Sequence, residues 1–167
     1  IFDVRKINEA PDDFVKSIKI SNLSQNDKRI SYALKAAQFI MKNECKPIEL
    51  AKKFNNDADL LRKALINEQG MGYGNKKADM FIRDMFVLKI WPDLINFDKI
   101  DVASDINTVK IALRTGILKT AIPLLSSFLD IFCYQYGYID EMSANAWRCV
   151  WKIWNDTYPT ETVASPA

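Results

Sequence analysis

The sequence contains no histidine, and this absence removes several classes of protein from consideration. Catalytic triads and acid–base pairs that depend on an imidazole are excluded, since only that side chain changes charge near neutral pH without a shift of its pKa. The cysteines number three, lie far apart and form no Cys-x-x-Cys pair. We therefore expect reduced thiols, no disulfide framework and no zinc site.

A strong excess of charge and a long apolar run are also lacking. The net charge of +2 is too small to indicate nucleic-acid binding by itself, although one local basic patch can bind DNA. No apolar run approaches the roughly 20 residues that span a bilayer, and no signal peptide opens the chain. We expect no membrane partner and an intracellular protein, in the cytoplasm or nucleoid, or in the nucleus of a eukaryote.

The apolar residues follow a helical period almost throughout the 167 residues, and no segment has a convincing strand pattern. The sequence therefore predicts a single all-α domain over residues 1–167. Expected helices begin at Pro11 and then cover 26–41, 47–54, 60–69, 76–91, 105–115, 121–136 and 143–155. Two apolar stripes are expected to face inward: Met80, Phe81, Met85 and Leu88 in one helix, and Trp147, Val150, Trp151 and Trp154 in the last.

The most informative segment is Gly72-Tyr73-Gly74-Asn75-Lys76-Lys77-Ala78-Asp79. Two glycines flank one large residue directly before an expected helix. This pattern predicts a tight turn whose backbone N–H groups point at a group bound over the helix N-terminus, where a phosphate would fit. Together with its flanking helices, over about residues 59–91, this predicts a helix-hairpin-helix in which residues 72–75 and Lys77 bind DNA phosphates. Small Ala78 suits a close approach of the two helices. A plain connection between helices is the alternative interpretation.

Lys76 and Asp105 are the candidate catalytic residues. A lysine attacks carbon only when unprotonated, and on spacing alone either Lys76 or Lys77 could be the reactive one. Asp105 opens an expected helix over about residues 104–116, where an acid also serves simply to complement the helix dipole. Asp98 and Asp101 compete with it for the catalytic role.

Together these two elements resemble the helix-hairpin-helix DNA glycosylase (HhH-GPD) superfamily, and most closely its archaeal 8-oxoguanine DNA glycosylase-like members. The hairpin corresponds to residues 72–79, which puts Lys76 at the Schiff-base lysine, and Asp105-Ile106-Asn107 through Gly116 matches the segment of the family's aspartate. Met71 replaces the usual proline before the hairpin. The four-cysteine iron–sulfur motif of some members is absent.

The resemblance implies a helical DNA-glycosylase-like bundle that excises a damaged base, with 8-oxoguanine as the expected lesion, and then cleaves the strand through its β-lyase activity. Its partner would be double-stranded DNA containing a lesion, and its only expected cation a structural one at the hairpin. Met80 would form a wall of the base pocket, although a core methionine is the alternative, as it is for the tryptophans of the last helix. The family pattern extends beyond this chain at both ends, so we expect a partial fold that further chain segments complete.

Two other functions remain open at this point. One is a noncatalytic helix-hairpin-helix module that binds DNA through the same backbone contacts. The other is an all-α interaction subunit that has the fold without the chemistry.

Overall fold

The structure, a computed structural model, describes residues 3–17, 26–119 and 136–167. These residues form helices and connecting turns with no named strand, so the predicted all-α class is confirmed. The one strand-like pairing described is an isolated bridge between Asp57 and Ile95. The helices are α1 (Val4–Glu9), α2 (Pro11–Ser17), α3 (Asn26–Lys42), α4 (Leu50–Lys53), α5 (Ala58–Asn67), α6 (Asn75–Val87), α7 (Ile106–Thr115) and α9 (Tyr136–Thr157), with short 3-10 turns at Pro47–Glu49 and Phe97–Lys99.

The main hydrophobic core lies around α5 and α6. These two helices pack against each other, and Ala78 is fully buried between them, as its small size predicts. Leu61, Ile82 and Ile100 are likewise fully buried. Arg62 of α5 donates two hydrogen bonds to the buried carboxylate of Asp79, which joins the helices through an ion pair as well as through apolar contact.

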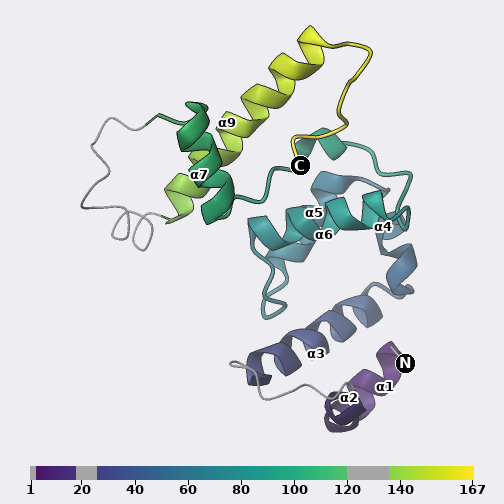
Figure 1. Ribbon diagram of the computed structural model, residues 1–167. Helices are drawn as coiled ribbons and strands as arrows, with labels where there is room; N and C mark the ends of the chain where they lie inside the picture. Colours follow the sequence, from purple (N-terminus) through teal and green to yellow (C-terminus); the bar gives the residue numbers. More distant parts are fainter. Residues whose placement is uncertain (1–2, 18–25, 120–135) are drawn as a thin grey trace, which may run out of the picture.

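A second layer is formed by α1, α2 and α3. Both short helices contact α3, and the three lie together below the α5–α6 layer in Figure 1. Helix α1, which was not predicted, begins where Asp3 accepts a hydrogen bond from the N–H of Arg5. Such a cap stabilises even a helix of 6 residues by satisfying one of its free amides.

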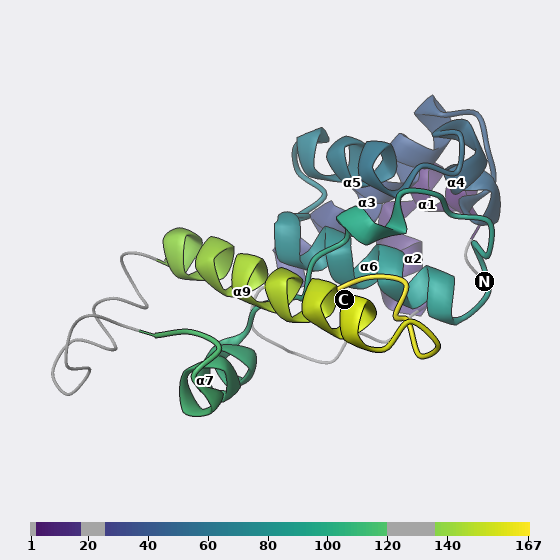
Figure 2. The same cartoon turned by 90° about the horizontal axis from the view of Figure 1, so that it is seen from above.

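Helices α7 and α9 form a third unit beside the core, and Figure 2 shows them next to each other. Val109 and Ala112 are the buried residues of α7. Arg148 of α9 links this unit to the core side, since its guanidinium donates to the Asp101 carboxylate and to the Asp98 carbonyl.

The last residues of the chain turn back along α9. The indole N–H groups of Trp151 and Trp154 donate to the carbonyls of Val163 and Glu161, respectively. Ala167 then packs against the main core. The two tryptophans therefore hold a returning segment. Neither is a fully buried core residue, because Trp151 is half-buried and Trp154 is 42% exposed.

Three details of the predicted helices are wrong. Helix α6 ends at Val87 and not at Trp91, because the chain turns at Leu88 and Lys89, where φ is +57°. The predicted inward stripe is half right: Phe81 and Met85 pack against the core, whereas Met80 and Leu88 are exposed. The buried face of α6 consists of Ala78, Asp79 and Ile82. Helix α9 begins at Tyr136 and not at Ser143, since its start includes a glycine that disfavours a helical prediction. Of the expected helix over 121–136, only the last residue is described.

No helix in the described ranges has both the length and the apolar composition that crossing a membrane requires.

Candidate active site at the start of α6

The connection between α5 and α6 needs glycine at two points. Gly70 and Gly72 have φ of +86° and +72°, in the region that side chains with a Cβ disfavour. A Cβ on Gly72 would also lie 2.7 Å from the ring of Tyr32 in α3. The turn is therefore pressed against α3, and this close approach fixes where α6 begins.

The N-terminus of α6 carries no side-chain cap. Gly74 is the N-cap residue, and it has no side chain that could accept a hydrogen bond from the first turn. In the described part of the chain, the backbone N–H groups of Asn75, Lys76 and Lys77 have no acceptor, while the N–H of Ala78 donates to the Gly74 carbonyl. Three amides therefore point outward at the positive end of the helix dipole.

Tyr73 turns its side chain toward the core. Its ring centroid lies 5.6 Å from that of Phe81, and burial raises the pKa of its phenol. Of the predicted DNA-binding residues, Tyr73 is therefore partly buried, whereas Asn75 and Lys77 have exposed side chains.

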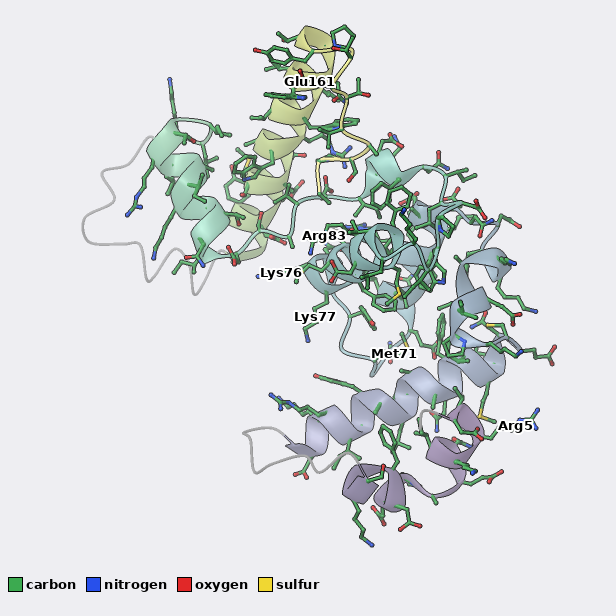
Figure 3. All side chains as sticks on the ribbon, turned by 45° about the vertical axis from the view of Figure 1, so that its right-hand side comes forward. Arg5, Met71, Lys76, Lys77, Arg83 and Glu161 are labelled. Carbon is green, nitrogen blue, oxygen red and sulfur yellow. The ribbon has the colours of Figure 1, made fainter. Side chains whose placement is uncertain are left out.

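Lys76 lies in a polar pocket of about 350 Å³. The pocket is bounded by α5, by the first turns of α6 and α9, and by the segment that connects the core to α7. Its charged lining residues are Arg62, Lys76, Asp79, Asp101, Asp140 and Glu141, and its amides come from Asn75 and Asn145. The volume falls in the lower part of the range of small-molecule sites. Figure 3 shows Lys76 and Lys77 extending from the same end of α6.

Asp105 is the N-cap residue of α7. Its carboxylate accepts hydrogen bonds from the N–H groups of Asn107 and Thr108, at 2.9 and 2.8 Å, and from the Thr108 hydroxyl. The Thr108 amide contributes most to holding the pKa of this carboxyl below its ordinary value, and the positive charge of Lys76 lowers the pKa further. Asp105 therefore lies within the electrostatic reach of Lys76, although it does not line the pocket.

The two competing aspartates are bound elsewhere. Asp101 lines the pocket, but its carboxylate accepts two hydrogen bonds from Arg148. Asp98 forms an exposed ion pair with Lys99 at 3.4 Å. Because each of these carboxylates already has a cationic partner, neither is available to balance the charge of Lys76.

Asp140 is an acidic residue that the sequence did not single out. It lies in the first two turns of α9 and lines the same pocket as Lys76. Burial raises the pKa of its carboxyl, against the lowering effects of the Lys76 charge and of a hydrogen bond from Ser104. No local pattern could have revealed it, because the start of α9 was not predicted and Asp140 comes near Lys76 only in the folded chain.

Lys77 and Met80 face a different side of α6. The Lys77 ammonium lies 5.6 Å above the centre of the Tyr32 ring, and both residues line a shallow groove between α3 and α6 with Gly72. Met80 is 37% exposed and lines this groove too, so the core alternative for Met80 is wrong. The structure thus separates Met80 from the pocket that contains Lys76.

The described side chains give no support for a bound metal ion at this site. Among the residues that the structure describes, no three histidine, cysteine or acidic side chains form a cluster suited to a metal ion. A cation at the hairpin would have to bind backbone carbonyls, and it stays a prediction.

No protein-family model, no curated protein and no solved structure matches the chain.

Proposed function

We propose that the chain is a DNA glycosylase with lyase activity, which excises a damaged base through a Schiff base on Lys76. One observation carries the proposal. Lys76, at the uncapped N-terminus of α6, lines a pocket with Asp140, and its charge acts on the carboxyls of both Asp140 and Asp105, whose surroundings differ. An amine nucleophile, an anion-binding helix end and acids within electrostatic reach are the parts that chemistry at a sugar carbon of DNA requires.

The free amides of α6 support a backbone contact with DNA. The N–H groups of residues 75–77 can donate to phosphate oxygens, and such contacts position a strand without reading its sequence. Lys77 adds an exposed positive charge at the same helix end. The net charge of +2 is compatible with this, because the contact needs only a local patch.

The reaction follows from the positions of Lys76 and Asp105. A nucleotide must leave the helical stack before its C1′ can be reached, and the Lys76 pocket would receive the sugar carbon of this flipped nucleotide. The ionised Asp105 would stabilise the positive charge that develops on the sugar as the base departs. Lys76 would then hold the sugar as a Schiff base, from which the strand is cleaved. The resemblance to the archaeal enzymes makes 8-oxoguanine the expected lesion.

The test uses duplexes that each carry one lesion, and a duplex with one abasic site. Wild-type protein should release a base from at least one lesion duplex, and borohydride should trap a covalent adduct with the abasic duplex. Lys76→Gln should bind the duplex but form no adduct. Lys77→Gln is the matched control: it should bind more weakly and still be trapped, because it keeps the nucleophile.

A noncatalytic DNA-binding module is the second candidate. It is favoured by one observation, namely that the Asp105 carboxylate is engaged by the amides of α7 and does not line the pocket. Salt-dependent binding of DNA without any trapped adduct would select this function. Absence of binding at every salt concentration would instead favour an all-α interaction subunit.

A further inference from the structure

We propose that Asp140 is the residue that takes the proton from Lys76 before the lysine attacks, so that the site has two carboxylates with separate tasks. This inference rests on the proposed function, because it assigns a step of the same reaction. It arises from the pocket that Asp140 shares with Lys76 and from the hydrogen bond between Ser104 and Asp140.

The first argument is position. Asp140 and Lys76 line one pocket from opposite elements, α9 and α6, and no other residue forms an ion pair with either side chain among the described residues. The two groups also form no direct ion pair within 4 Å of each other. Both groups line the same polar pocket of about 350 Å³, so water within it can relay a proton from one to the other.

The second argument is orientation. Ser104 is buried, 1% exposed, and directly precedes Asp105 in the chain. Its hydroxyl donates to Asp140, while the next residue caps α7. One short segment therefore positions both carboxylates around the same lysine, one through a side-chain hydrogen bond and one through the N-cap.

The third argument is the difference between the two acids. The helix amides, with Thr108 first, keep Asp105 ionised by lowering its pKa, which makes it a weak base suited to stabilising a cation. Burial raises the pKa of Asp140, which makes it the stronger base of the two. Pairs of acids that their surroundings push in opposite directions commonly divide into an electrostatic and a proton-transferring group.

Proton transfer would also suit the electrostatics of the pocket. It converts a lysinium and a carboxylate into two neutral groups, and confined surroundings favour neutral groups over charged ones. The other charges that face Asp140 are few and of both signs: Arg62 from α5, Asp79 from α6, Asp101 from the connecting segment and Glu141 from α9 itself. Arg62 and Asp79 already neutralise each other, so Lys76 is the cation that Asp140 meets.

The steps balance in protons and electrons. The Lys76 ammonium gives one proton to the Asp140 carboxylate, and the freed lone pair forms a bond to C1′. On a lesion nucleotide the base leaves with the electrons of the glycosidic bond and receives that proton from Asp140. On an abasic site the aldehyde oxygen is protonated instead and leaves as water, which gives the Schiff base. Asp140 is a carboxylate again at the end of either sequence.

The test measures single-turnover strand cleavage and borohydride trapping on the abasic-site duplex as functions of pH. Asp140→Asn should be slowed about 10²- to 10⁴-fold near pH 7, the usual worth of a general base, and the loss should shrink as rising pH deprotonates the lysine directly. Asp140→Glu, which keeps a carboxylate, should recover much of the rate. Asp156→Asn makes the same change on an exposed part of α9 and should leave the rate and its pH profile unchanged.

Circular dichroism and duplex binding at each pH establish that the variants are folded. A folded Asp140→Asn protein with the wild-type rate, or with a loss that is the same at every pH, would overturn the inference while leaving the proposed function intact. If wild-type protein forms no adduct through Lys76, the proposed function fails, and the role of Asp140 fails with it.

Discussion

Replacing Gly72 with alanine tests the geometry on which the position of Lys76 depends. Gly72 has φ of +72°, and a Cβ added there would lie 2.7 Å from the Tyr32 ring. Gly116, at the end of α7, has a similar φ of +76°, but nothing lies within 4 Å of its added Cβ. The two glycines therefore separate the cost of backbone strain from the cost of crowding.

The expected magnitudes follow from these two terms. A left-handed backbone costs an ordinary residue about 1–2 kcal/mol, and losing a glycine returns about 0.4–1 kcal/mol by restricting the unfolded chain. Gly116→Ala should therefore lower the free energy of unfolding by about 1 kcal/mol. Crowding in a packed region adds about 1–3 kcal/mol, so Gly72→Ala should lower it by about 2–4 kcal/mol.

Urea denaturation of the two single variants measures both values, and a double-mutant cycle with Tyr32→Leu isolates the crowding. In the Tyr32→Leu background, Gly72→Ala should cost only about 1 kcal/mol, because the ring it meets is gone. The contact between Lys77 and this ring cancels within the cycle. Equal costs at Gly72 and Gly116, or a coupling energy near zero, would refute the packing of the turn against α3.

Three further predictions concern the ion pair, the cap and the charge at the helix end. Asp79→Asn should lower the free energy of unfolding by about 3 kcal/mol or more in urea, because it leaves the partly buried Arg62 without its anion. Asp105→Asn should flatten the acid dependence of stability. The N–H of Thr108 holds the folded pKa of Asp105 below its unfolded value of 3.8, so its contribution is present above that pH and is lost as pH falls through the folded pKa. Lys77→Gln should reduce the slope of log affinity for DNA against log salt by about 1.

Each of these has an outcome that contradicts it. Asp84→Asn breaks an exposed ion pair on the same helix and should change stability by less than about 1 kcal/mol, so an equal effect at Asp79 would be evidence against a buried pair. Urea midpoints of wild type and Asp105→Asn that fall in parallel below about pH 4 would rule out the N-cap shift. An unchanged salt slope would remove Lys77 from the DNA contact.

Local patterns were sufficient for most of the helices. The helical period between glycine-rich and asparagine-rich turns predicted α5 and α6 because propensity, capping and packing agree there. The end of α6 was not predicted correctly, because Lys89 adopts a left-handed conformation at a position where the sequence has no glycine to indicate it. The start of α9 was likewise not predicted, because Gly137 weakens the helical pattern, and this part of the helix is held from outside by Ser104.

The candidate site was predictable only in part. Lys76 and Asp105 could be proposed from motifs, since a glycine turn and an N-cap are local features. Asp140 could not, because nothing local distinguishes an acid on a helix that faces a lysine from one that faces solvent. The rotation of α6 that exposes Met80 depends likewise on Asp79, a polar residue that is buried because Arg62 is there to pair with it.

The link through Arg148 has a consequence for the pocket that contains Lys76. Helices α7 and α9 contact each other, and among the residues described they meet the core side mainly through residues 98–105 and the returning tail. The Lys76 pocket is lined from both sides of this junction, by α5 and α6 on one side and by α9 on the other. Its shape therefore depends on the contacts that Arg148 makes with Asp98 and Asp101, as well as on the side chains that line it.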